Sequence, residues 1–181
     1  MIKSTKHYKN NQLTRDLLLK GTSKNVMNCP KLDKISLSLT TKEALINSNK
    51  LLIPLMLLKL ITGQKPKITK ARKSIAQFKL RQGKAIGCKV TLRNKMMYSF
   101  LDKIIYNILP QIIELKTEKI MVNFNSLTIG IEDISVFSEL ENQYEFLKNT
   151  QGLNINLSVK NNKSKNKPKY LFSGLKIPTN K

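Results

Sequence analysis

Two neighbouring stretches of the chain, residues 74–81 and 86–93, alternate between apolar and polar side chains. A period of two over this length predicts two strands, each with one buried face. The connection between the stretches contains Gly83, so we expect the two strands to pair antiparallel. The buried faces are predicted to hold Ala76, Phe78 and Leu80 in the first strand and Ile86, Cys88, Val90 and Leu92 in the second.

The opposite faces of both stretches carry cations, and they belong to a longer segment without any acidic residue, residues 65–93. A single sign of charge over this length favours contact with phosphate groups, because Lys and Arg on phosphate release condensed counterions. A solvated face is the other interpretation of a charge run. The whole chain shares the bias, with a formal net charge of +22. The cations of the segment are Lys65, Lys67, Lys70, Arg72, Lys73, Lys79, Arg81, Lys84, Lys89 and Arg93.

Two helices are predicted before this segment. The first covers residues 11–20 and stops at Gly21. The second covers residues 49–62 and is closed by Gly63 in the left-handed conformation. Pro54 lies too deep for the first turn of the second helix, so it should kink that helix or delay its start.

A third helix follows the segment, with Asn94 as its N-cap and Pro110 as its end. Apolar side chains recur on one face of it and are expected to be buried. They are Met97, Phe100, Leu101, Ile104, Ile105, Ile108 and Leu109.

Further strands are predicted at residues 32–39, 127–131 and 153–160, because apolar side chains alternate with polar ones there. Together the elements predict an α+β fold, with helices packed on one face of an antiparallel β-sheet. We expect one domain over residues 1–181, with a mobile basic loop rich in Lys, Asn and Ser near residues 160–169.

Catalytic and metal-binding patterns are weak in this sequence. His7 lies in a polar stretch and is expected at the surface, and Cys88 falls on the apolar side of a strand as a core residue. Cys29 and Cys88 fit neither a zinc spacing nor a disulfide framework. No Gly-rich phosphate loop follows a strand, and the adjacent acids Glu132 and Asp133 point to opposite faces. We therefore expect no enzyme activity, no cofactor and no metal.

A membrane surface is another polyanion that a basic protein can bind. The most apolar run, residues 51–61, is about half the length that spans a bilayer, and it contains Pro54 and Lys59. It predicts a buried helix and no membrane span. Residues 1–20 show no secretory signal.

Residues 63–93, GQKPKITKARKSIAQFKLRQGKAIGCKVTLR, resemble the signature region of universal family five of large-subunit ribosomal proteins, which binds 5S rRNA. Residues 25–39, NVMNCPKLDKISLSL, resemble the family's first strand and its approach. Residues 129–132, 152–153 and 177–178 occur in the family's order, so the resemblance covers almost the whole chain.

This resemblance implies a structural protein of the central protuberance that anchors 5S rRNA to the large-subunit rRNA. It also implies a contact with a small-subunit head protein across an intersubunit bridge, a contact with the elbow of the P-site tRNA, and neighbouring central-protuberance proteins as partners.

The resemblance and the cationic sheet face together give two sets of candidate site residues. The 5S rRNA contacts are expected at Asn25, Lys34, Ser38, Gln64, Lys65, Lys89, Thr91 and Arg93. The tRNA-facing loop is expected to comprise Lys70, Ala71, Arg72, Lys73, Ser74, Gln77, Lys79, Arg81 and Gln82.

Some residues depart from the family pattern. Ser38 stands where the family has an asparagine, and the Arg-rich stretch after Pro110 is replaced by residues 111–114, QIIE. A bacterial-like centre with heavy use of Lys, Asn and Ile suggests a mitochondrial ribosome in the matrix, with a plastid or the bacterial cytoplasm as alternatives. The rival functions are a free-standing basic RNA chaperone or regulator and an RNA-modifying enzyme.

Overall fold

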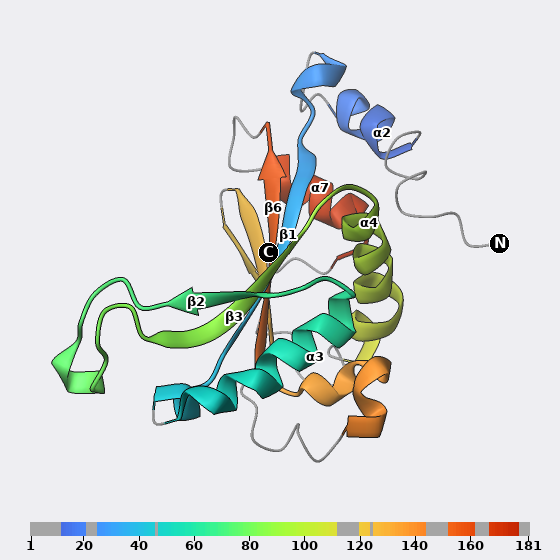
Figure 1. Cartoon of the computed structure of the whole chain (residues 1–181). Coiled ribbons are helices and arrows are strands. Elements are labelled where there is room, and N and C mark those ends of the chain that lie inside the picture. Colours follow the sequence, from blue (N-terminus) through green and yellow to red (C-terminus); the bar gives the residue numbers. More distant parts are fainter. Residues whose placement is uncertain are drawn as a thin grey trace. The chain divides into compact units, whose positions relative to one another are not determined.

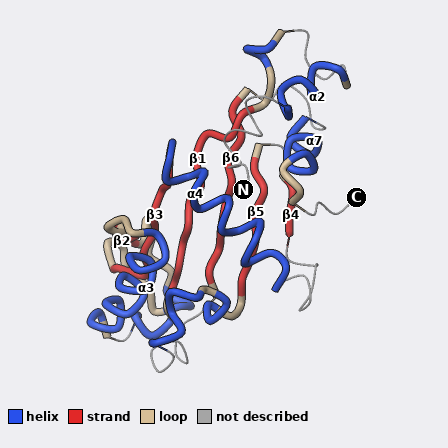
Figure 2. Tube along the Cα trace, turned by 90° about the vertical axis from the view of Figure 1, so that its right-hand side faces the viewer, coloured by secondary structure: helices blue, strands red, loops and turns tan. Residues whose placement is uncertain are grey.

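The computed structural model describes residues 12–20, 25–45, 47–111, 120–123, 125–143, 152–161 and 167–177. Its strands form one six-stranded sheet in the order β2-β3-β1-β6-β5-β4 (Figures 1 and 2). The strands are β1 (Lys31–Thr40), β2 (Lys67–Lys70), β3 (Ala85–Leu92), β4 (Ile120–Val122), β5 (Ser126–Ile131) and β6 (Leu153–Lys160). The α-helices are α2 (Thr14–Leu19), α3 (Leu52–Thr62), α4 (Asn94–Lys103) and α7 (Lys167–Gly174).

The sheet is antiparallel, which confirms the predicted α+β class. β2 pairs antiparallel with β3, and β4 pairs antiparallel with β5. The chain forms two compact units. The first unit comprises residues 1–35, 92–129 and 156–181, and the second comprises residues 36–91 and 130–155. The expected single domain over residues 1–181 stays a prediction.

Four predicted strands are confirmed, and one of them is β3, which begins and ends one residue before the predicted 86–93. β1 extends the predicted strand 32–39 by one residue at each end, β5 begins one residue before the predicted 127–131, and β6 has the predicted bounds. In β1 the side chains of Ile35, Leu37 and Leu39 are fully buried, as the alternation predicts. Two short edge strands, β2 and β4, were missed, since each has at most four residues and too little alternation to recognise.

The predicted strand at residues 74–81 is wrong. Only Ile75 and Leu80 form a bridge there, and Ala76–Phe78 form a 3-10 turn between them. β3 pairs instead with β2, so the hairpin is longer than expected and its connection covers residues 71–84. Residues 74–81, although they alternate, therefore lie in an exposed loop and form no buried strand face. In β3 itself, Cys88, Val90 and Leu92 are buried as predicted, while Ile86 is only half-buried.

Local chemistry explains where α3 begins and ends. A 3-10 turn, Ser48–Leu51, precedes the helix, so Pro54 falls in the first helical turn, where its missing N–H costs nothing. Gly63 ends the helix in the left-handed conformation at φ 67°, and its N–H donates to the Lys59 carbonyl at 2.8 Å. Both expectations for this helix are confirmed. The first predicted helix forms as α2, while its expected stop, Gly21, lies outside the described residues.

The third predicted helix forms, but both of its predicted ends are wrong. Arg93 is the N-cap in extended conformation, and Asn94 begins the helix with φ 52°. Residues 104–108 form a π-helical turn, and the helix continues at least to Gln111. Pro110 lacks an N–H and crowds the carbonyl four residues before it. The wider π turn accommodates this proline, so the helix passes through Pro110 instead of ending there.

In the first unit, α4 lies across one face of the strands (Figure 2). Its buried side chains, Met97, Phe100 and Leu101, supply part of the core. In the second unit, the buried side chains of α3 include Leu57, Leu58 and Ile61. Within the described residues, no helix combines the length and apolarity that crossing a membrane requires.

The helix α7 was missed, and it shortens the predicted basic loop. Lys160 still belongs to β6, and Lys167–Gly174 form the helix, so residues 160 and 167–169 are not loop. Residues 162–166 lie outside the described part of the chain. Leu171 and Phe172 of α7 are fully buried, so this helix is stabilised by packing against other parts of the chain.

The close approach of β3 to β1 gives a stability prediction. A Cβ at Gly87 would lie 2.5 Å from the backbone oxygen of Leu39, while a Cβ at Gly130 in β5 would meet nothing closer than 3.8 Å. We expect Gly87→Ala to lower the free energy of unfolding by about 1–3 kcal/mol, because backbone must shift. Gly130→Ala is the matched control and should unfold at the same or a higher urea concentration. Equal urea midpoints for Gly87→Ala and the unsubstituted chain would contradict the packing argument.

Candidate nucleic-acid interface

Two lysines lie directly opposite each other in the β2–β3 hairpin. Lys67 of β2 is the Cα partner of Lys89 of β3, and both are exposed. Like charges at directly opposed positions destabilise a strand pair. The hairpin therefore keeps a repulsion that a bound polyanion would relieve. Lys67 was outside the predicted site, because its strand was not recognised.

One polar face of the second unit collects three predicted 5S rRNA contacts. Cys88, Val90 and Leu92 of β3 are buried, so Lys89 and Thr91 project from the opposite face of that strand. Ser38 takes the equivalent position on β1, the neighbouring strand. Thr91 and Ser38 are half-buried, while Lys89 is exposed. The face thus offers the ammonium groups of Lys89 and of Lys67 opposite it beside two hydroxyls, a set that suits phosphate and ribose oxygens.

Gln64 and Lys65 follow α3 in the short connection to β2, and both are exposed. Thr62 orders the start of this connection, since its Oγ1 donates to the Leu58 carbonyl at 2.6 Å and accepts the Gln64 N–H at 3.3 Å. The backbone that presents Gln64 is therefore fixed by the end of the helix.

The other three predicted 5S contacts belong to the first unit. Asn25 is exposed and precedes the 3-10 turn Val26–Asn28, and Lys34 is half-buried on β1. Arg93 has a protein partner: its Nη1 lies 3.4 Å from Oδ1 of Asp33. An exposed ion pair of this kind contributes about 0–1 kcal/mol. Because this ion pair is weak, Arg93 can leave the Asp33 carboxylate and bind a phosphate instead.

Backbone hydrogen bonds close the connection between β2 and β3 at both ends. We call residues 71–84 the basic loop. At its base, Ala71 N–H donates to the Lys84 carbonyl at 2.8 Å, and Gly83 N–H donates to the Ala71 carbonyl at 3.0 Å. At its tip, the N–H groups and carbonyls of Ile75 and Leu80 exchange hydrogen bonds of 2.9 and 3.1 Å. These bonds define the path of the loop backbone.

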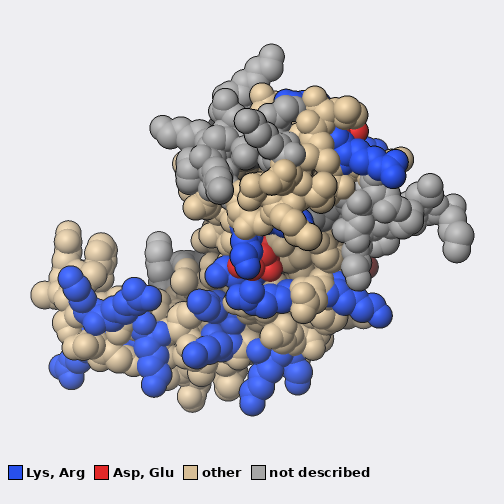
Figure 3. Space-filling view, turned by 90° about the horizontal axis from the view of Figure 1, so that it is seen from above, with Lys and Arg blue, Asp and Glu red and all other residues tan. Residues whose placement is uncertain are grey.

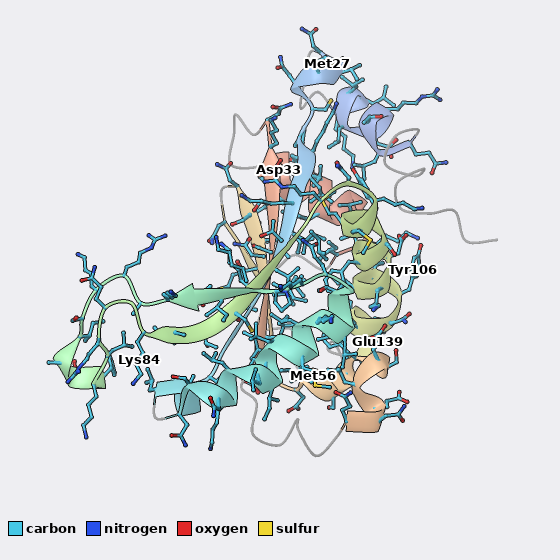
Figure 4. The ribbon with its side chains drawn as sticks, in the orientation of Figure 1. Met27, Asp33, Met56, Lys84, Tyr106 and Glu139 are labelled. Carbon is cyan, nitrogen blue, oxygen red and sulfur yellow. The ribbon has the colours of Figure 1, made fainter. Side chains whose placement is uncertain are left out.

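Three predicted tRNA-facing residues help to hold this loop together. Ala71 is half-buried and takes part through its backbone, and the hydroxyl of Ser74 accepts the Gln82 N–H at 3.0 Å. Lys84, which is labelled in Figure 4, also anchors the loop, since its Nζ donates to the carbonyl of Leu45. No sequence pattern indicates this anchor, because the two residues are far apart along the chain.

The remaining predicted tRNA-facing side chains are all exposed. Figure 3 shows Lys and Arg side chains gathered along the projecting loop, with no acidic side chain visible on it. This arrangement produces a one-sign surface that attracts a phosphate backbone. The exposed residues of the predicted set, of which five are cations, are Lys70, Arg72, Lys73, Ser74, Gln77, Lys79, Arg81 and Gln82.

The tip of the loop differs from the sequence prediction. The alternation predicts Phe78 on a buried strand face, yet 60% of its surface is exposed, and Ile75, which pairs with Leu80 to close the tip, is 45% exposed. Lys79 follows Phe78 in the left-handed conformation, at φ 51°. The period-two pattern was misleading here, because it assumes a regular strand that does not form.

No described group is arranged for catalysis. Cys88 is 1% exposed, and burial raises the pKa of its thiol from 9.0 to about 12, so it stays protonated at neutral pH. This confirms Cys88 as a core residue. Among the residues described, no cluster of His, Cys, Asp and Glu could hold a metal ion. His7 lies outside the described residues.

Comparisons with known proteins identify the family of this chain. The family described as "Ribosomal protein L5" matches residues 25–81, and the C-terminal model of the same ribosomal protein family matches residues 85–179. The large ribosomal subunit protein uL5m of Reclinomonas americana is 41% identical over 97% of each chain. The large ribosomal subunit protein uL5 of Blochmanniella floridana is 38% identical over 88% of this chain and 83% of its own. This chain therefore belongs to the ribosomal protein L5 family, whose members are structural and not enzymatic components of the large ribosomal subunit.

Proposed function

We propose that this protein binds 5S rRNA in the central protuberance of a mitochondrial ribosome and reaches the P-site tRNA through the basic loop. The observation that carries the proposal is the separation of two cationic surfaces in the second unit. One is the polar strand face with Ser38, Lys89 and Thr91, and the other is the exposed basic loop.

The strand face suits a fixed and extensive RNA contact. β3 carries its donors on a packed strand, so their spacing is set before RNA arrives. Lys89 provides a positive charge for a phosphate of the RNA. The half-buried Thr91 hydroxyl provides a direct hydrogen bond to the RNA in place of the water that binding displaces. Release of the Lys67–Lys89 repulsion adds to the affinity of this face for an anion.

The basic loop suits a contact made at a distance from the sheet. Residues 71–84 project from β2 and β3 and end in the 3-10 turn, at the far left of Figure 1. Six of its side chains are exposed cations or amides, which hold a phosphate backbone without reading its sequence. A passing ligand such as tRNA fits such a contact, because charge-dominated binding forms and breaks quickly.

Other partners follow from the same assignment. The large-subunit rRNA, a small-subunit head protein across an intersubunit bridge, and neighbouring central-protuberance proteins would cover further parts of the surface. The mitochondrial matrix is favoured by the 41% identity to uL5m of Reclinomonas americana. Recovery of the tagged chain in purified mitochondrial ribosomes would test the location, with plastid or bacterial ribosomes as the alternatives.

Crosslinking and sequencing of RNA bound to the tagged protein in its native extract tests the function as a whole. We expect reads to concentrate on 5S rRNA and on the central-protuberance region of the large rRNA. Reads scattered over many messengers would favour the free-standing RNA chaperone. That alternative also predicts loss of the protein from large subunits in moderate salt, because a chaperone binds by charge alone.

Two sets of variants should separate the two surfaces. Arg72→Ala with Arg81→Ala should weaken tRNA binding and lower the slope of log K against log salt by roughly 1.4–1.8, since two phosphate contacts are lost. The same double variant should leave 5S rRNA binding almost unchanged. Filter binding of each RNA at several salt concentrations measures both quantities.

Thr91→Val is the reciprocal variant. It keeps the shape of the side chain and a strand-forming residue, so the fold should persist. It should weaken 5S rRNA binding by roughly 1–3 kcal/mol if the Thr91 hydroxyl makes a buried hydrogen bond in the complex. Loss of 5S rRNA binding in the arginine double variant, with none in Thr91→Val, would refute the division between the two surfaces.

The opposed lysines predict that one substitution will increase stability and weaken binding. Lys89→Gln should raise the free energy of unfolding of the isolated protein by about 0.2–1 kcal/mol, because it removes the repulsion from Lys67. The gain should shrink at high salt, and 5S rRNA binding should weaken. Lys65→Gln is the charge-matched control outside the strands. If both variants change the urea midpoint equally, cross-strand repulsion is not the cause.

A further inference from the structure

The tip of the basic loop presents an apolar pair where the sequence pattern predicted none. Phe78 is 60% exposed and Ile75 is 45% exposed. The other phenylalanines in the described part of the chain, Phe100, Phe137 and Phe172, are at most 4% exposed. Exposure of an aromatic ring to water is unfavourable in the isolated protein, and a ligand that covered the ring would remove this cost.

The loop backbone holds Phe78 outward by defined contacts. The ring belongs to the 3-10 turn Ala76–Phe78, which the Ile75–Leu80 bridge closes. Lys79 then adopts φ 51° and ψ 37°, a left-handed conformation that lysine rarely takes, and its N–H donates to the Ala76 carbonyl at 2.9 Å. Strained residues of this kind persist where the surrounding structure specifies them, and they cluster at ligand contacts.

The charges around the tip identify the chemistry of that ligand. Arg72, Lys73, Lys79 and Arg81 are exposed on the same loop, and residues 65–93 contain no acid. A ligand must therefore offer anionic groups next to a flat apolar surface. Nucleic acid has this combination, with phosphates beside the π faces of its bases. An anionic membrane also combines charge with apolar groups, but two side chains bury too little area for stable membrane insertion.

We infer that Phe78 is a stacking platform for an unpaired nucleobase, with Ile75 as its apolar neighbour and the loop cations as phosphate contacts. The identity of the ligand as tRNA rests on the proposed function. Stacking on Phe78 would add a non-ionic contact to the ionic contacts that the loop cations make with phosphates. Stacking is tolerant of base identity, so the ring would fix the position of an exposed base without selecting its sequence.

The chain has no tryptophan, so Phe78→Trp introduces a single fluorescent reporter that retains stacking. In the full-length protein we expect saturable quenching of this fluorescence by a tRNA transcript. Inorganic polyphosphate, which has the charge but no bases, should bind without quenching. Met121→Trp is the matched control at another exposed apolar position, 67% exposed on β4, and it should not respond to tRNA. Equal quenching by polyphosphate and tRNA would overturn the stacking contact.

Phe78→Ala provides an independent measurement. It should weaken tRNA binding roughly 5- to 150-fold, the range that corresponds to one stacked base. The slope of log K against log salt should stay unchanged, because no charge is removed. Circular dichroism should show an unaltered fold, as the ring is exposed. A change of slope like that of the arginine double variant, or no change of affinity, contradicts the inference.

The outcomes also separate this inference from the proposed function. If tRNA binds through Arg72 and Arg81 but never quenches Phe78→Trp, stacking fails and the proposed function stands. If tRNA does not bind but single-stranded oligoadenylate RNA quenches the reporter, stacking stands and the tRNA contact fails. A blue-shifted increase in fluorescence with phosphatidylglycerol vesicles, without any response to RNA, would assign the tip to a membrane surface and overturn the inference.

Discussion

The close approach of β3 to β1 is the constraint on which the cationic surface depends. At Gly87 the two backbones lie so near that a single Cβ would come within 2.5 Å of the Leu39 oxygen. This approach fixes the register of β3, and a slip of one residue would exchange its two faces. Register therefore decides that Cys88 enters the core while Lys89 and Thr91 face outward. The chemistry of the surface follows from a packing requirement in the sheet.

Charge is the second constraint, and it acts against the isolated fold. A formal net charge of +22 destabilises the compact state through self-repulsion. The pairing of Lys67 with Lys89 adds a direct repulsion within one strand pair. Buried apolar side chains such as Leu37 and Leu101 must outweigh this repulsion. An RNA partner removes it, since phosphates neutralise the cations and free their counterions. Stability and binding are therefore linked in this protein.

The basic loop combines order with exposure. Its base is closed by Ala71 and Gly83, and Lys84 ties it to Leu45. Its tip is closed by the Ile75–Leu80 bridge. Such a loop loses less conformational entropy on binding than an unstructured one of equal length. Under the proposed function, this preorganised loop would make a short-lived contact with tRNA at modest affinity, while the strand face would hold the permanent RNA partner.

Alternation and charge are local properties, and they were enough to predict the α+β class, strands β1, β3, β5 and β6, and the cationic character of residues 65–93. The remaining features depend on contacts between distant parts of the chain. β2 is too short to show a period, and it becomes a strand only by pairing with β3. Phe78 alternates like a buried residue, yet the bridge that closes the loop turns it outward. Periodicity records which side chains could share a face, whereas long-range pairing determines whether that face meets the core or the solvent.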